Sequence, residues 1–293
     1  MKIRKAIVAV AGSGTRLLPA TKSMPKEMLP IVDKPIIQLV VEELVEAGIE
    51  DIIFVTRWDK KPLEDHFDHS TALEDELKKK GEGKPDSRYN ELAESIKLIA
   101  DMANFIYVRQ KGPYGNGTPV LSAASLVVNE PFVFVFGDDL VKSKTSFTKQ
   151  MIEEYEKTGN AIISVQEVPL EVVNRYGIVK IKEGTNILED IIEKPSVEEA
   201  PSRLAVFGRM VVNQEIVDIL KQLPTGKDNE LWMTDAYKAY IAQGGVVVAK
   251  ELTDGEWLTT GDPLNYIKTI LKYAIEREDI GEEIKTFTKD LLK

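Results

Sequence analysis

The sequence predicts an α/β fold in which helices cover both faces of a mostly parallel sheet. Three observations lead to this prediction. Short apolar runs rich in β-branched residues recur along the chain, helical patterns lie between them, and the first four runs lack the polar alternation of a half-exposed strand. Strands that alternate with helices form parallel sheets, and such sheets bind ligands at the carboxyl ends of their strands. The loops after these runs are therefore where a site is expected.

The individual elements follow from the patterns in chain order. Strands are expected at Ala6–Val10, Asp51–Val55, Phe105–Val108, Phe132–Phe136, Ala161–Val165 and Val246–Ala249. A helix is expected from Ile36 to Ala47, because apolar residues there follow the helical repeat and Gly48 ends it. Residues 69–95 are polar with a Gly/Pro break, which predicts an exposed helix and a connector. Residues 265–279 and 282–292 read as two helices that pack outside the sheet or against another subunit.

Composition excludes several classes of protein. The chain has 293 residues, about twice the usual domain size, which favours one large domain with an appendage. Its 48 acidic and 38 basic residues give a net charge of -10, so the chain as a whole repels nucleic acid and anionic membranes. The absence of cysteine excludes disulfides, zinc thiolate sites and thiol catalysis. No signal peptide and no apolar stretch near the roughly 18 residues of a membrane helix are seen, so a cytoplasmic protein is expected.

The segment after the first strand has the features of a phosphate-binding loop. Gly12 and Gly14 allow the backbone to approach a ligand closely. Their neighbours Ser13, Thr15 and Arg16 supply hydrogen-bond donors. Prolines stiffen the continuation, which carries Lys22 and Lys26. Two glycines after a strand also suit a plain tight turn, and the loop lacks both the Walker pattern and the third glycine of the dinucleotide fingerprint. Rigid positive charge beside the glycines nevertheless favours a polyphosphate.

Polar residues after later strands are further candidates, each with an alternative interpretation. Asp138 and Asp139 follow a buried strand and a glycine, where carboxylates suit Mg²⁺ or a turn. Gln110 carries donors and an acceptor that can read the edge of a pyrimidine, although an exposed strand end looks the same. Glu193 and Lys194 can bind sugar hydroxyls and a phosphate monoester, or be solvated surface.

The segment AGSGTRLLPATKSMPKEMLPIVDKPIIQLVVEE, residues 11–43, resembles the amino-terminal signature of the sugar-1-phosphate nucleotidyltransferases. Within them it is most similar to the bacterial and archaeal branch of UTP:glucose-1-phosphate uridylyltransferases. Further motifs follow in the family's order: EDHFD (64–68), YVRQKGPYGNG (107–117), FGDDLV (136–141), YGIV (176–179), EKPS (193–196), EEAPSRLAVFGR (198–209), MTDA (233–236) and TGDP (260–263). The resemblance implies a Rossmann-like nucleotidyltransferase fold with a central mixed, mostly parallel sheet. It makes residues 1–264 the α/β domain and residues 265–293 a C-terminal helical extension of the same compact unit.

The resemblance also implies a reaction and a role for each matching residue. The reaction transfers a uridylyl group from UTP to glucose 1-phosphate and gives UDP-glucose and pyrophosphate. Mg²⁺ would lie on Asp138 and Asp262, while Arg16 meets the pyrophosphate, Lys26 the α-phosphate and Lys194 the attacking phosphate. The implied nucleotide contacts are Ala11, Gly12, Ser13, Gly14, Thr15, Arg16, Lys26, Gln110, Gly115 and Asp138. The implied sugar-phosphate contacts are Gly177, Glu193 and Lys194.

Four positions depart from the family's wording: Val10, Thr118, Trp232 and Pro263. Trp232 stands where a smaller residue is common, which can reshape the sugar side of the pocket. The departures leave open a sister enzyme that uses dTTP or another sugar 1-phosphate, such as galactose or N-acetylglucosamine phosphate. A silent regulator that binds a nucleotide sugar is another alternative, against which the intact lysines and carboxylates argue. A homodimer or homotetramer is implied, with the C-terminal helices as its plausible contact.

Overall fold

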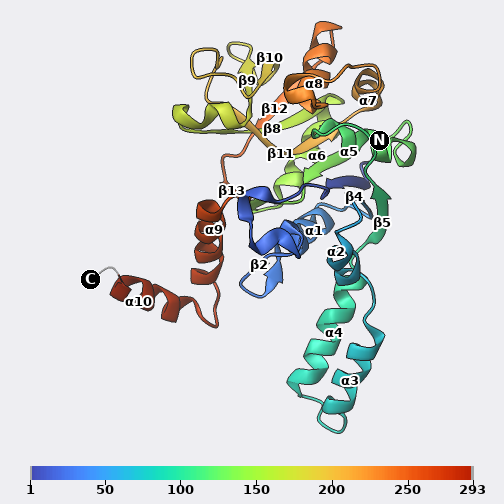
Figure 1. The fold of residues 1–293 in the computed structure, drawn as a ribbon, viewed down its shortest axis with the longest axis vertical. Coiled ribbons are helices and arrows are strands. Elements are labelled where there is room, and N and C mark those ends of the chain that lie inside the picture. The colour runs from blue at the N-terminus through green and yellow to red at the C-terminus, as the bar shows by residue number, and fades with distance from the viewer. Residues whose placement is uncertain (1, 292–293) are drawn as a thin grey trace.

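The structure is a computed structural model that describes residues 2–291. Within this range, nine strands form one mixed sheet (Figure 1). Seven of them follow one another in the order given below, and the other two branch from it, because β8 pairs with β11 and β12 pairs with β8. The order of the seven neighbouring strands is β10 (Leu188–Glu193), β9 (Gly177–Ile181), β11 (Leu204–Val212), β6 (Phe132–Phe136), β1 (Lys5–Ala9), β4 (Asp51–Thr56) and β5 (Asn104–Arg109). The two branching strands of this sheet are β8 (Ala161–Glu167) and β12 (Val247–Glu251). Two separate two-stranded sheets pair β2 (Pro30–Ile31) with β3 (Lys34–Pro35) and β7 (Asp139–Ser143) with β13 (Gly255–Thr259).

The four predicted parallel strands are confirmed, but burial on both faces is confirmed only for β1, β4 and β6. Strand β5 is the edge strand, and its residues are exposed or half-buried. Strand β1 lies between β4 and β6 and runs parallel to both, and β5 runs parallel to β4. Because parallel strands end at the same edge of a sheet, the loops that follow these four strands lie together there. The predicted strands at 161–165 and 246–249 are also present, as β8 and β12.

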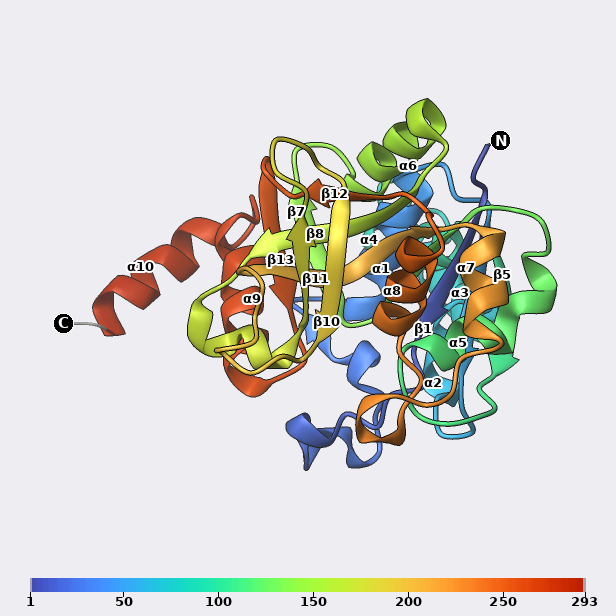
Figure 2. The ribbon, with the colours of Figure 1, turned by 90° about the horizontal axis from the view of Figure 1, so that it is seen from above.

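Helices cover both faces of the sheet, which explains why its central strands are apolar throughout. Helices α1 (Ile36–Glu46) and α6 (Phe147–Thr158) pack on one face, and Val8 of β1 belongs to that core. Helices α5 (Gly117–Ala123), α7 (Gln214–Leu220) and α8 (Met233–Ala242) pack on the other, with Ile7 of β1 (Figure 2). Successive side chains of a strand point to opposite faces, so a sheet buried on both sides requires continuous apolar runs.

The antiparallel part of the sheet was not predicted from the sequence. Strand β11 runs antiparallel to β6, β8 and β9, so the sheet is mixed, as the family resemblance implies. Strand β11 contains Arg209, whose side chain is fully buried. Its Nη2 donates to Glu43 Oε2 of α1 over 2.6 Å. Burying a guanidinium requires such a charged partner, and no local pattern shows that α1 supplies it.

Residues 69–95 form a helical hairpin rather than one helix and a connector. Helices α3 (Thr71–Gly81) and α4 (Arg88–Ala100) pack against each other and project from the body, beyond the short α2 (Lys61–His66) (Figure 1). Ser87 Oγ accepts a hydrogen bond from Tyr89 N and caps α4. The predicted exposure of this segment is confirmed. The predicted connector is wrong, because a second helix, α4, begins shortly after the Gly/Pro break.

The two predicted C-terminal helices are present as α9 (Pro263–Ile275) and α10 (Gly281–Leu291). Helix α9 packs on β13 and β2, and Tyr266 Oη donates to Pro30 O over 2.8 Å. Helix α10 extends away from the body (Figures 1 and 2). The predicted end of this last helix at residue 292 lies outside the described residues, and the domain division at residue 264 stays a prediction. Among residues 2–291, no helix is both long and apolar enough to span a membrane.

Candidate active site

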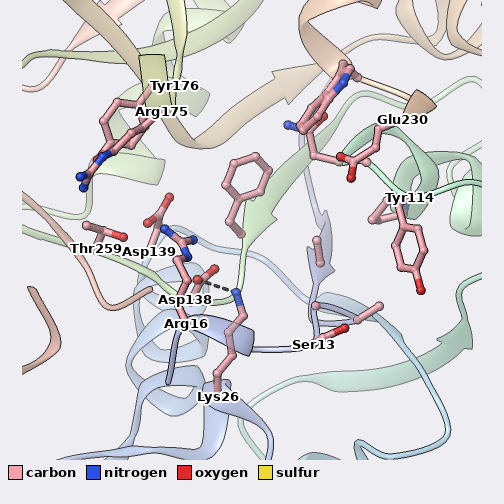
Figure 3. A pocket seen from close by; sticks show the side chains of 18 of the residues that line it. Ser13, Arg16, Lys26, Tyr114, Asp138, Asp139, Arg175, Tyr176, Glu230 and Thr259 are labelled. Atoms are coloured by element: carbon pink, nitrogen blue, oxygen red, sulfur yellow. Dashed lines mark hydrogen bonds and ion pairs between the residues drawn. The ribbon is translucent and has the colours of Figure 1, made fainter. Parts of the chain in front are cut away.

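A cavity of about 440 Å³ opens at the carboxyl edge of the parallel strands (Figure 3). Its walls come from the loops after β1, β5 and β6, from the segments before β9 and α8, and from β13 and the turn before α9. The residues predicted to bind nucleotide or metal that line it are Ala11, Gly12, Ser13, Arg16, Lys26, Gln110, Gly115, Asp138 and Asp262. Five predicted site residues are not part of its lining: Gly14, Thr15, Gly177, Glu193 and Lys194.

The loop after β1 folds back on itself and brings Lys26 to its glycines. Gly14 has a φ of 64°, in the left-handed region that favours glycine, and its carbonyl accepts a 2.7 Å hydrogen bond from Thr21 Oγ1. A Cβ on Gly14 would lie 3.1 Å from Thr21 Cγ2, and one on Gly12 would lie 3.4 Å from Lys26 Cε. Gly14 and Thr15 therefore build the turn, while Gly12 leaves room for the lysine that faces the cavity.

Lys26 forms an ion pair with Asp138, the central contact of the site (Figure 3). Its Nζ lies 2.6 Å from Asp138 Oδ2, and both side chains are largely buried. Burial alone would raise the pKa of Asp138, but the adjacent Lys26 and the charge of Arg16 outweigh it and lower that pKa. Burial likewise opposes charge on Lys26, yet Asp138 and Glu27 raise its pKa above the ordinary value. Both groups are therefore charged at neutral pH.

Local packing explains why a glycine precedes Asp138. Gly137 N donates to Ala9 O over 3.1 Å as β6 ends, and a Cβ at 137 would lie 2.6 Å from Val10 Cγ1. The carbonyl of Asp138 accepts hydrogen bonds from Thr260 N at 3.1 Å and Thr260 Oγ1 at 2.7 Å. These bonds hold the turn before α9 against the end of β6, so two segments far apart in the sequence form one edge of the cavity.

Asp262 is the residue of that turn that faces the cavity. It caps α9, because its Oδ1 accepts Asn265 N at 3.0 Å and its Oδ2 accepts Asn265 Nδ2 at 2.7 Å. Burial opposes its ionisation, but these bonds and the charges of Arg16 and Arg175 together lower the pKa of Asp262. Gly261, next to it, is close enough to the other carboxylate that a Cβ there would lie 3.3 Å from Asp138 Oδ2.

The two ionised aspartates suit a hard divalent cation such as Mg²⁺. No group of three or more His, Cys, Asp or Glu side chains placed to hold a metal occurs among residues 2–291. Mg²⁺ usually takes one or two carboxylates and completes its ligands with substrate phosphates and water, so two aspartates suffice. Asp139 is bound differently, because its Oδ2 accepts Gly208 N at 3.1 Å. Burial and the charge of Asp138 raise the pKa of Asp139 to about 6.

The predicted base-binding residues lie on a loop that the chain before α8 holds in place. Gly115 has a φ of 115°, and a Cβ there would lie 2.2 Å from Leu231 O. Leu231 N donates to Tyr114 O, and Gly117 N donates to Leu231 O, both over 2.8 Å. Gln110 N donates to Thr56 O over 2.8 Å, which places Gln110 at the end of β5. Glycine at 115 is thus required by the protein's own packing, whether or not a base lies against it.

The predicted sugar-phosphate residues come together beside the cavity. Gly177 and Glu193 are partners in the β9–β10 pair, and Thr234 Oγ1 donates to Glu193 Oε2 over 2.9 Å. Burial raises the pKa of Glu193. Lys194 N donates to Tyr176 O over 2.9 Å, and its Nζ lies 4.1 Å from the ring centroid of Trp232. Tyr176 and Trp232, rather than the three predicted residues, form the cavity wall here.

Several lining residues were not predicted from the sequence. Arg175 and Tyr176 point into the cavity near Asp139 and Thr259, and Glu230 and Tyr114 lie on its opposite side (Figure 3). The only sequence signal that could have found them is their position in or near quoted motifs. Tyr176 begins YGIV and Arg175 precedes it, Tyr114 lies within YVRQKGPYGNG, and Glu230 lies three residues before MTDA. Trp257 also lines the cavity, and it stacks on Phe207 with ring centroids 5.3 Å apart.

A cationic glycine loop, a buried lysine–aspartate pair and a second aspartate on one sheet edge are what transfer of a nucleotide between phosphates requires. The nucleotidyl transferase family model matches residues 5–276, and the chain belongs to this family.

Several relatives and solved structures are similar to this chain over most or all of its length. UTP-glucose-1-phosphate uridylyltransferases of Staphylococcus epidermidis and Staphylococcus saprophyticus are each 43% identical, over 99% of both chains and 100% of both chains respectively. UDP-glucose pyrophosphorylase from Acinetobacter baumannii is 37% identical, with a TM-score of 0.87 over 99% of each chain. A UDP-glucose pyrophosphorylase complexed with UDP-glucose is 39% identical, with a TM-score of 0.81 over 94% of this chain and 100% of that one.

Proposed function

We propose that this chain transfers a uridylyl group from UTP to glucose 1-phosphate, forming UDP-glucose and releasing pyrophosphate. Relatives that match it along its full length are named for this activity. The observation that carries the proposal is the Lys26–Asp138 pair, which faces the same cavity as Arg16 and Asp262. It combines cations for phosphate oxygens with ionised carboxylates for a metal, in a cavity at the end of the sheet.

The chemistry calls for charge and alignment rather than a general base. The phosphate of glucose 1-phosphate is already an adequate nucleophile, and the main obstacle is the repulsion between two anions that must approach in line. Lys26 binds the α-phosphate, Arg16 binds the departing pyrophosphate and Lys194 binds the attacking phosphate. Asp138 and Asp262 would hold Mg²⁺, which would supply positive charge at the α-phosphate.

The remaining predicted residues select the two substrates. Gln110 and the loop around Gly115 face the uracil, and Gly177 and Glu193 bind the sugar. The support for this division is spatial, because Gln110 and Gly115 belong to the end of β5 and its loop, whereas Gly177 and Glu193 belong to the β9–β10 pair.

The chain acts as a homodimer or homotetramer in the cytoplasm. Support for assembly comes from the C-terminal helices, where large apolar side chains are exposed: Leu264, Ile267, Leu271, Phe287 and Leu291. Large apolar groups left in water on two neighbouring helices mark a surface that another molecule covers. The substrates, a nucleoside triphosphate and a sugar phosphate, support the location.

Pyrophosphate release tests the proposed reaction. UTP and dTTP are each combined with glucose, galactose and N-acetylglucosamine 1-phosphates in the presence of Mg²⁺. Fast release is expected only with UTP and glucose 1-phosphate, and the Asp138→Asn variant serves as a control for contaminating activity. Release that favours another pair would move the assignment to a sister enzyme, and no release with any pair would contradict transferase activity.

A further inference from the structure

Three contacts hold Lys194 in a conformation that a lysine rarely adopts. Its φ is 44°, in the left-handed region that favours glycine. Its N donates to Tyr176 O over 2.9 Å, its O accepts Lys227 Nζ over 2.6 Å, and its Nζ lies 4.1 Å from the ring centroid of Trp232. Such a backbone conformation persists only where surrounding contacts enforce it, so the structure specifies where this ammonium lies.

Trp232 is a fixed platform rather than a loose surface ring. Its side chain is 7% exposed, and its Nε1 donates to Lys227 O over 2.9 Å. Lys227 therefore contacts both partners, because its ammonium binds the carbonyl of Lys194 and its carbonyl binds the indole of Trp232. The indole lines the cavity, so the ammonium rests against a residue of the cavity wall.

The residues on either side of Trp232 are anchored to the nucleotide side of the cavity. Leu231 exchanges hydrogen bonds with Tyr114 and Gly117, and Met233 N donates to Asn116 Oδ1 over 2.7 Å. The ring that holds Lys194 is thus carried by a segment fixed on the loop around Gly115. This arrangement places Lys194 relative to the predicted nucleotide site, although Lys194 belongs to a distant part of the sheet.

We propose that Trp232 is a positioning residue that holds the Lys194 ammonium for the phosphate of the sugar substrate. The inference rests on the role proposed above for Lys194. The face of an indole attracts a cation, and an ammonium with three N–H groups can rest on a ring and still donate to a phosphate. Without the ring, the flexible four-carbon stem of lysine loses its orientation.

Substitution of Trp232 tests the proposal in the intact chain. We expect Trp232→Leu to raise the KM for glucose 1-phosphate about three- to thirty-fold, the range of a cation–π contact, with the KM for UTP unchanged. Trp232→Phe keeps an aromatic face and is expected to show a smaller rise. The matched control is Trp58→Leu, because Trp58 is 85% exposed and is not part of the cavity lining. Trp232→Gln takes the place of the leucine variant if that variant does not fold.

A double-mutant cycle with Lys194→Met separates this inference from the proposed function. The readouts are the KM for glucose 1-phosphate and the dissociation constant of UDP-glucose, measured by calorimetry. If Trp232 acts through Lys194, Trp232→Leu has no further effect in the Lys194→Met background. Equal effects in both backgrounds, or an unchanged KM in Trp232→Leu alone, would overturn the inference and leave the proposed function intact. Normal kinetics of Lys194→Met would instead remove the role proposed for the lysine.

Discussion

Lys26 and Asp138 compensate each other's charge at the edge of a cavity that must receive two phosphate-bearing substrates. An ammonium that is already partly desolvated and held 2.6 Å from a carboxylate needs little reorganisation when a phosphate arrives. The same carboxylate keeps the lysine protonated, since the pKa of Lys26 is raised. Asp138 therefore keeps the Lys26 side chain positively charged.

Replacing Lys26 by methionine is expected to lower kcat about 10²- to 10³-fold, because a preorganised contact to developing charge is lost. The measurement is pyrophosphate release by variant protein whose fold is verified by thermal denaturation. Lys5→Met is the matched control. Lys5 is a partly buried lysine at the other end of β1, where it binds Leu126 O and Glu130, and its loss should leave kcat unchanged. Near-normal turnover of Lys26→Met would remove the assigned role.

His66 makes the stability of the chain sensitive to acid. Its Nε2 lies 3.0 Å from Gln38 Oε1, and burial lowers the pKa of His66 below 6.5. The unfolded chain therefore binds a proton more readily, and stability is lost as the pH falls below about 6.5. His66→Asn removes this titration, so its melting temperature should drop less than that of the parent between pH 7.5 and 5.5. An equal drop in both proteins would show that His66 does not contribute.

At the scale of elements, the loop after β4 holds the glycine loop after β1 in place through two side-chain contacts. Arg57 Nη1 donates to Ser13 Oγ over 2.8 Å, and Lys60 Nζ donates to Glu27 Oε2 over 2.8 Å. Glu27 and Lys60 are both almost completely buried, and Glu27 directly follows Lys26. Burial raises the pKa of Glu27, and the nearby lysines oppose that rise. The second ion pair thus fixes the short helical turn Lys26–Met28, which contains both Lys26 and Glu27.

Breaking this buried pair should be costly, because it leaves a carboxylate without its partner. We expect Lys60→Met to lower the free energy of unfolding by about 3–5 kcal/mol, measured by urea denaturation. The adjacent Lys61 provides the control, since its ion pair with Asp65 is exposed and its loss should leave stability unchanged. Similar stability of the two variants would contradict the structural role of the buried pair.

Elements also show where prediction from sequence works. The four parallel strands and α1 were predicted closely, because apolar runs and the helical repeat are visible in local patterns. The expected burial of β5 on both faces was wrong, because β5 lies at the edge of the sheet. Strand β11 was missed, since its buried Arg209 depends on Glu43 of α1. The hairpin of α3 and α4 was half predicted, because a polar surface helix carries little apolar periodicity.

At the scale of the whole molecule, the C-terminal helices carry large apolar side chains that remain exposed in the single chain. Helix α10 projects from the body (Figures 1 and 2), and its Phe287 and Leu291 are 59% and 68% exposed. We expect Phe287→Asp to shift the chain from an oligomer toward monomers in sedimentation velocity, because a buried unpaired charge opposes association. Val128→Asp, at an exposed position before β6, should leave assembly unchanged. A parent chain that sediments as a monomer would contradict the proposed oligomer.

The candidate site was predicted in part. Most of the expected nucleotide and metal residues line one cavity, because they follow strands whose carboxyl ends meet at one edge. The expected sugar-phosphate residues do not line the cavity, whose wall includes Tyr176 and Trp232 instead, and Arg175 and Glu230 were not expected at all. These residues come from the antiparallel part of the sheet and the segment before α8, whose place could not be read from periodicity.

The α/β class, the parallel strands and the glycine loop after the first strand follow from local patterns in the sequence, because hydrophobic period, glycine and charge are properties of short segments. Which distant residues come into contact is visible only in the folded molecule. Thr260 binds the backbone of Asp138, Lys60 neutralises Glu27, and Trp232 holds Lys194. Such contacts depend on strand order and on how helices pack across the sheet, and both result from burying the whole core at once.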